Sequence, residues 1–185
     1  DLVAEQIRIA AGEPLQLRQE DIQQSGHAIE CRVCAEDAYN GFTPETGKVL
    51  FLQEPSGEGV RFDSGLYPKQ AITTAFDPML AKLIAHADDR EKATAKAIGG
   101  LRKLVLLGVN TNADYMTQVM QHPAFTNGEV DTGFLAERAD ELTEPTLSTE
   151  ERDALLAAAL LNDRSIKAMM HNTPKPHAAI GSWRN

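Results

Sequence analysis

The chain has 185 residues, of which 42% are hydrophobic and 24% charged, and 27 Asp and Glu against 18 Lys and Arg give it a net charge of −9. That length suits one globular domain, or one domain with an appended arm, because domains usually hold about 100 to 200 residues. The acidic balance argues against a general binder of nucleic acid or of anionic membranes, and the apolar runs are far shorter than the roughly 20 residues that span a bilayer.

Two cysteines are too few for a disulfide scaffold, and the sequence begins at Asp1 without an initiator Met, a basic segment or an apolar leader. These features predict a protein of cytosolic character. They also predict that the sequence has been cut from a longer chain.

The first predicted elements are a helix and a strand. Apolar residues recur at helical spacing over 2–10, and a glycine and a proline follow as a stop. The alternation over 26–35 predicts a strand, in which every second residue shares a face. Glu30 and Arg32 are therefore expected on the face opposite Cys31.

Short extended segments are predicted next, over 49–52, 60–63, 71–75 and 80–86. The Gly-rich turn at 55–59 separates the first two of them and is typical of a hairpin that pairs them.

From Asp88 onward apolar residues recur at three and four positions, which predicts an amphipathic helix that ends at Gly108. Gly99 and Gly100 lie inside it and should each cost about 1 kcal/mol relative to Ala. We therefore expect a neighbouring element to approach closely at this pair.

Two further helices are expected, one from Asn112 or Asp114 to the break at His122 and a shorter one after Asp131. Residues 143–149 form a linker. Ser148 then predicts an N-cap for a final helix, with acidic residues in its first turn. The stretch 171–185 has no periodic pattern. Strands gathered before helices predict an α+β fold, with an antiparallel sheet covered by helices on one side and a helical C-terminal arm.

Cys31 and Cys34 form a lone C-x-x-C, which is compatible with metal or redox chemistry. A structural zinc needs four ligands, however, and no second pair stands at suitable spacing. Residues three apart on a strand also point to opposite faces. A structural role is therefore favoured, and no metal site is expected.

Arg32 is the main candidate for chemistry, because Glu30 shares its face and a guanidinium held by carboxylates on a strand can offer fixed donors to an oxyanion. The residues alone favour a structural salt bridge over this role. Asp77 and Lys82 leave the same choice open, between turn or surface residues and partners of Arg32.

A resemblance to a known family adds to these patterns. The run GHAIECRVCAED at 26–37 is similar to the G-H-A-[IV]-E-C-R-[IV]-x-A-E-D signature of biotin carboxylases, and more matches follow in order. These are F-x-P-x-x-G-K at 42–48, G-V-R-x-D-S-G at 59–65, D-P-M-L-A-K-L-I at 77–84, G-V-x-T-N at 108–112 and D-T-G-F-L at 131–135. The resemblance covers about residues 1–142 and is to the family's carboxy-terminal lobe.

The resemblance implies part of a ligase that carboxylates biotin with ATP and bicarbonate, giving carboxybiotin, ADP and phosphate. Residues 1–24 would be a helix and linker from the upstream ATP-grasp region, 25–142 the biotin carboxylase C-terminal domain, and 143–185 a linker and helical arm toward the carrier side. Most ATP contacts, the Mg²⁺ ligands and the general base would lie upstream, so this piece alone is expected to be inactive.

The arm resembles the one in biotin-dependent acyl-CoA carboxylase α chains of the propionyl-CoA, acetyl-CoA or methylcrotonyl-CoA type. The implied partners are the upstream ATP-grasp domain, a biotin carrier domain and a carboxyltransferase β subunit, with no nucleic acid or membrane. The implied location is the cytoplasm, or the mitochondrial matrix in a eukaryote.

The resemblance also implies roles for single residues. Arg32 matches the family arginine that faces the biotin ureido oxygen and stabilises the enolate formed when N1 loses its proton. Glu30, Asp77 and Lys82 would support the biotin side of the site. Thr132 matches a position near the adenine of the nucleotide.

The sequence departs from the family in places. In stand-alone bacterial subunits the Gly-rich turn presents an aromatic side chain and an arginine to a homodimer partner, whereas here Glu58 precedes Arg61. Both are expected interface residues, but in an assembly other than that dimer. Phe76 stands where Tyr is common, and Lys69 where Gly is common.

A non-catalytic assembly module of a multidomain carboxylase is the alternative function. The charged residues Glu30, Arg32, Asp77 and Lys82 favour the catalytic interpretation, because a scaffold has no physical need for such a constellation on a half-buried sheet.

Overall fold

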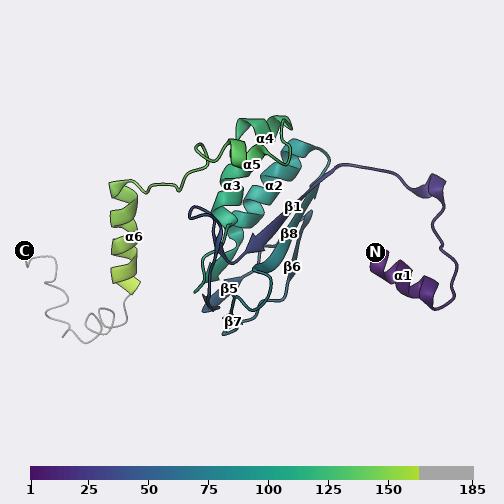
Figure 1. Cartoon of the computed structure of the whole chain (residues 1–185), viewed down its shortest axis with the longest axis horizontal. Coiled ribbons are helices and arrows are strands. Elements are labelled where there is room, and N and C mark those ends of the chain that lie inside the picture. The colour runs from purple at the N-terminus through teal and green to yellow at the C-terminus, as the bar shows by residue number, and fades with distance from the viewer. Residues whose placement is uncertain (163–185) are drawn as a thin grey trace, which may run out of the picture. The chain divides into compact units, whose positions relative to one another are not determined.

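The computed structural model describes residues 1–162, and its ribbon is drawn in Figure 1. Contacts divide the chain into one compact unit of residues 1–143 and a second that begins at Glu144, and each is described by itself. The unpatterned stretch 171–185 lies outside the described residues.

A three-stranded antiparallel sheet forms the centre of the first unit (Figure 1). Its order is β1 (His27–Cys34), β8 (Met79–Ala87) and β6 (Val60–Ser64), so that β1 and β6 are the edges of this sheet. The register sets Arg32 opposite Lys82, and Lys82 opposite Asp63 on the other side.

The strand alternation divides the sheet into a core face and an open face. The face of β1 that carries Cys31 and Val33 is buried, because these residues are 5% and 0% exposed. Leu83 of β8 belongs to the same buried cluster. The helix α2 (Arg90–Lys103) packs on this face through Ala93, Ala97 and Leu101. Helices therefore cover one side of an antiparallel sheet, which confirms the predicted α+β class.

The predicted hairpin is wrong, because its two strands pair with other partners. β5 (Phe51–Gln53) pairs with β9 (Val105–Leu107), whereas β6 pairs with β8. Val49 is bonded instead to the loop before β7, accepting from Lys69 N at 2.7 Å and donating to Gln70 O at 2.9 Å. The turn reverses the chain, but apolar packing selects the partner of each strand.

Shorter strands and helices complete the fold. The strand pairs are β2 (Glu36–Asp37) with β3 (Thr43–Pro44) and β4 (Gly47–Lys48) with β7 (Ala71–Ile72). The remaining helical segments are α1 (Leu2–Ala10), the 3₁₀ turn Gln19–Asp21, α3 (Ala113–Gln121), α4 (Pro123–Asn127), α5 (Phe134–Glu137) and α6 (Thr149–Asn162).

The predicted ends of the helices are partly confirmed. Asp89 caps α2 by accepting from Lys92 N at 2.8 Å, but α2 ends at Lys103 rather than at Gly108. Leu104 turns to extended backbone, with ψ at 121°, and the apolar run after it is used in the β5–β9 pair.

The caps of α6 and α4 show what local sequence can and cannot predict. Ser148 accepts from Glu151 N at 3.2 Å while Glu151 accepts from Ser148 N at 2.9 Å, which confirms the predicted cap of α6. α4 was not predicted. The break at His122 becomes its start, because His122 Nδ1 accepts from Ala124 N at 3.1 Å and proline fits a first helical position.

No helix among residues 1–162 is long and apolar enough to cross a membrane.

The adjacent glycines of α2 differ in their surroundings. A Cβ on Gly100 would lie 2.7 Å from Leu83 Cδ1, which confirms the expected close approach there. A Cβ on Gly99 would meet nothing within 4 Å, so the same expectation is wrong for Gly99.

Alanine substitutions at these two positions should therefore differ in sign. We expect Gly99→Ala to raise the free energy of unfolding by up to about 1 kcal/mol, through helix propensity alone. Gly100→Ala should lower the free energy of unfolding by about 1–3 kcal/mol relative to the unsubstituted chain, because Leu83 must move in a packed core. Urea unfolding followed by circular dichroism measures both, and equal effects would contradict the close packing at Gly100.

Candidate functional site

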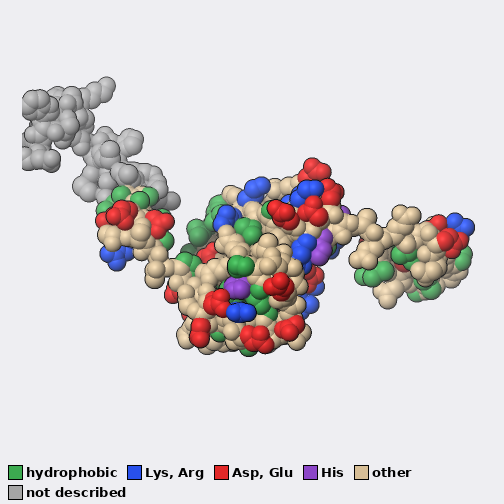
Figure 2. All heavy atoms as spheres, turned by 90° about the horizontal axis from the view of Figure 1, so that it is seen from above, with side chains coloured by type: hydrophobic (Ala, Val, Ile, Leu, Met, Phe, Trp, Pro, Cys, Tyr) green, Lys and Arg blue, Asp and Glu red, His purple; other side chains and the backbone are tan. Residues whose placement is uncertain are grey.

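The open face of the sheet carries charged side chains on all three strands. Because Cys31 and Val33 of β1 face the core, Glu30 and Arg32 project from the opposite side. Lys82 of β8 and the pair Arg61 and Asp63 of β6 lie beside them in the sheet register. This face holds three cations and two carboxylates on a chain whose net charge is −9. On the side of the first unit drawn in Figure 2, acidic and basic side chains are intermixed.

Glu30 is the centre of this cluster. Its Oε1 accepts a hydrogen bond from Arg32 Nε at 3.2 Å and lies 3.7 Å from Lys82 Nζ. Arg61 Nη2 donates to Asp63 Oδ2 at 2.9 Å in a separate pair. The Arg32 side chain is 68% exposed, and within residues 1–162 its one hydrogen bond uses Nε. Both Nη groups are therefore available to a ligand.

Asp77 lies at the turn before β8, near the carboxyl end of β1. Its carboxylate accepts from Met79 N at 2.7 Å, and the neighbouring Pro78 O accepts from Ala35 N at 2.8 Å. Burial raises the pKa of the half-buried Cys34 thiol, the charges of Glu36 and Asp77 raise it further, and Arg32 opposes them. These groups thus share one electrostatic environment at the end of β1.

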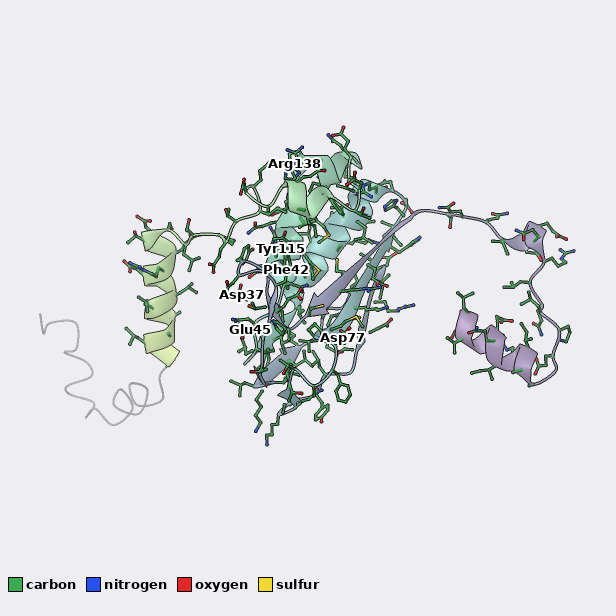
Figure 3. The ribbon with its side chains drawn as sticks, viewed as in Figure 1. Asp37, Phe42, Glu45, Asp77, Tyr115 and Arg138 are labelled. Atoms are coloured by element: carbon green, nitrogen blue, oxygen red, sulfur yellow. The ribbon has the colours of Figure 1, made fainter. Side chains whose placement is uncertain are left out.

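A hollow of about 360 Å³ opens beside Arg32. Residues of β1, Glu30 and Arg32 among them, line its strand side, and Met116, Met120 and Phe125 give it an apolar wall. Phe42 belongs to the same wall and packs edge to face on Tyr115, with ring centroids 5.2 Å apart (Figure 3). The hollow is thus largely apolar, and the guanidinium of Arg32 leaves β1 on the open face of the sheet.

Other predicted residues lie outside this cluster. Thr132 is exposed on the turn before α5, where Asp131 Oδ1 accepts from Gly133 N at 2.7 Å. Glu58 is exposed on the turn before β6. Gly59 fixes that turn with a φ of +72°, and a Cβ there would collide with His86 O. The structure thus joins Glu30, Arg32 and Lys82 directly, but gives Thr132 no contact with them.

One buried polar residue at the site was not predicted as functional. Asn112 lines the hollow and bonds to the backbone of β1 and to Glu36. The sequence indicated it only as a possible helix start and as part of G-V-x-T-N, because a contact with residues about eighty positions away leaves no local pattern.

Comparison with known families shows the family of this chain. Residues 30–137 match the family model described as the biotin carboxylase C-terminal domain. The chain belongs to this family. The match begins at Glu30 and includes every residue for which a role was predicted, namely Glu30, Arg32, Glu58, Arg61, Asp77, Lys82 and Thr132. Their individual roles stay predictions.

Individual biotin carboxylases are similar over most of this chain. Biotin carboxylase 2, chloroplastic, of Populus trichocarpa is 42% identical over 145 residues, which are 78% of this chain and 28% of that protein. Methylcrotonoyl-CoA carboxylase subunit alpha, mitochondrial, of Mus musculus is 37% identical over 161 residues, or 86% of this chain and 22% of that protein. The chain therefore spans less than a third of either relative.

Solved structures have the same fold. The biotin carboxylase domain of Hydrogenobacter thermophilus 2-oxoglutarate carboxylase, in complex with MgADP, ADP and bicarbonate, superposes with a TM-score of 0.76 at 35% identity. The match covers 79% of this chain and 32% of that one. Rhizobium etli pyruvate carboxylase gives the same TM-score at 31% identity, over 80% of this chain and 16% of that one.

The two cysteines of the biotin carboxylase lobe differ in environment. Burial, and next the charge of Glu30, raise the pKa of the Cys31 thiol to about 11, and its Sγ lies 3.9 Å from Met120 Sδ in the core. Cys34 is only half-buried. Within residues 1–162, no three His, Cys, Asp or Glu side chains gather as a metal site.

Thiol labelling should therefore distinguish the two cysteines in the folded protein. At pH 8 a thiol with a pKa of about 11 is ionised to about one part in a thousand. The pKa of the Cys34 thiol is raised too, but Cys34 is less buried than Cys31, so iodoacetamide should modify Cys34 first. Peptide mass spectrometry over a time course measures both rates. In urea the two rates should converge, and equal rates in the folded protein would contradict the assigned burial of Cys31.

Proposed function

We propose that this chain is the carboxy-terminal lobe of a biotin carboxylase and that Arg32 is its catalytic residue in the ATP-dependent carboxylation of biotin by bicarbonate. One observation carries the proposal: in a chain of this family, the Arg32 guanidinium stands exposed on the open face of the sheet, held through Nε by Glu30 at 3.2 Å. Its Nη groups remain free to donate to a substrate oxygen.

The chemistry needs such a donor. When the ureido nitrogen of biotin loses its proton, negative charge develops on the ureido oxygen. Fixed hydrogen-bond donors stabilise that charge without reorganising during the reaction, and this term is often the largest in catalysis. Arg32 meets the requirement because its backbone belongs to a sheet and its side chain is oriented by Glu30.

The other charged residues act through this arginine. Glu30 orients Arg32, and Lys82 adds a second positive charge 3.7 Å from the same carboxylate oxygen. Asp77 shapes the turn before β8 by accepting from Met79 N at 2.7 Å. These three residues support the biotin side of the site.

The remaining parts of the reaction belong to other segments. ATP, Mg²⁺ and the general base would be held by an ATP-grasp domain of the same enzyme, with Thr132 near the adenine. A biotin carrier domain and a carboxyltransferase β subunit would complete the assembly. Glu58 and Arg61 are the proposed interface residues, and the 72% exposure of the Arg61 side chain fits that role.

An acyl-CoA carboxylase α chain is the context that we favour. The match to the mouse methylcrotonoyl-CoA carboxylase subunit covers 86% of this chain, against 78% for the Populus biotin carboxylase. In such a chain, residues 143–185 would be the linker and arm that lead toward the carrier side.

Replacing Arg32 tests the proposed function in the full-length parent chain. We expect Arg32→Ala to lower the biotin-stimulated, bicarbonate-dependent rate of ATP hydrolysis by about 10²–10³-fold, because the oxyanion loses its donor. Arg102→Ala is the matched control, since Arg102 is an exposed arginine of α2 on the covered side of the sheet. If Arg32→Ala keeps full biotin stimulation, the lobe serves assembly only.

The chain of 185 residues should have no bicarbonate-dependent ATP hydrolysis by itself. The nucleotide and metal groups proposed for the ATP-grasp domain would be missing from the assay. A coupled assay for ADP at high protein concentration measures this, with the full-length parent as the positive control. Turnover by the chain alone would overturn the proposed division between the segments.

A further inference from the structure

We infer that Asn112 is a positioning residue, which holds the backbone of β1 at Arg32 and thereby fixes where the guanidinium stands. The inference rests on the proposed function, because it assigns Asn112 an effect on biotin carboxylation that is exerted through Arg32. Asn112 itself touches no reacting atom.

The geometry at the edge of the sheet supports this role. β1 is an edge strand, so one side of its backbone has no partner strand in the sheet. Asn112 takes that place at the carboxyl end of β1. Its Nδ2 donates to Arg32 O at 3.2 Å, its Oδ1 accepts from Cys34 N at 3.0 Å, and its own N donates to Cys34 O at 3.3 Å.

The chemistry of the bonds specifies asparagine. A carbonyl only accepts and a backbone N–H only donates, so Arg32 O and Cys34 N together require a side chain that does both. The second Nδ2 proton is also used, in a bond to Glu36 Oε1 at 2.8 Å. Asn112 is 7% exposed, and each of its side-chain donors and its acceptor has a partner.

The position of Asn112 in its helix gives a second argument. Asparagine at an N-cap usually accepts a hydrogen bond from the first turn of the helix, but Asn112 makes no such bond at the start of α3. Its side chain is committed to β1 instead. α3 is held in place by Met116 and Met120 against the core. A rigid helix is thus linked through one amide to the strand that carries Arg32.

The test uses the full-length parent chain and two rates, bicarbonate-dependent ATP hydrolysis with and without free biotin. Asn112→Asp keeps the size of the side chain, but it cannot donate to Arg32 O and it faces the carboxylate of Glu36. We expect this variant to lower the biotin-stimulated rate at least about tenfold and to leave the biotin-independent rate within twofold. Asn110→Asp, at an exposed position in the same loop, is the matched control and should change neither rate.

A double variant separates positioning from a general loss of structure. In the Arg32→Ala background, Asn112→Asp should cause no further loss of biotin stimulation, because the group that it positions is gone. Equal losses in both backgrounds, or equal losses of both rates, would overturn the inference. Asn112→Ser removes the amide without placing a second negative charge beside Glu36, and should lose less than Asn112→Asp. If Asn112→Asp and Asn112→Ser both fail to fold, the residue serves the fold alone and the inference is wrong.

The outcomes also separate this inference from the proposed function. Loss of stimulation in Arg32→Ala but not in Asn112→Asp would retain the proposed function and reject the positioning role. Full stimulation in Arg32→Ala would reject both.

Discussion

The antiparallel register of β1 against β8 is the constraint on which the site depends. Side chains alternate in a strand, so the register that sets Cys31 opposite Leu83 in the core also sets Arg32 opposite Lys82 on the open face. A slip by one residue would exchange the two faces and bury the guanidinium. The apolar residues that stabilise the sheet therefore also decide which face Arg32 occupies.

Stability and chemistry are divided between the two faces of the sheet. Leu83 and Val33 are fully buried, and burial of apolar area stabilises a fold by about 25 cal/mol per Å². The ion pairs around Glu30 are exposed, and such pairs contribute at most about 1 kcal/mol each. The charged cluster is thus poorly explained by stability, and its geometry can serve a ligand with little effect on folding.

How well the sequence predicted each element depends on how far apart in the chain the interacting residues lie. The alternation of β1, the start of α2 and the cap of α6 depend on residues close in the chain, and they were predicted correctly. The pairing of β5 with β9 and the end of α2 depend on packing between distant segments, and they were missed. The grouping of Glu30 with Arg32 followed from alternation, whereas Asn112 contacts Arg32 across 80 positions.

The hydrogen bonds made by the backbone at the edge of β1 also explain how the hollow beside it stays open. A fourth strand on this edge would satisfy the backbone of β1, but it would occupy the space that Glu30, Arg32 and Asn112 border. Asn112 bonds only the carboxyl end of the edge. A single side-chain amide therefore bonds the strand next to Arg32, and leaves the rest of the edge without a partner strand in the sheet.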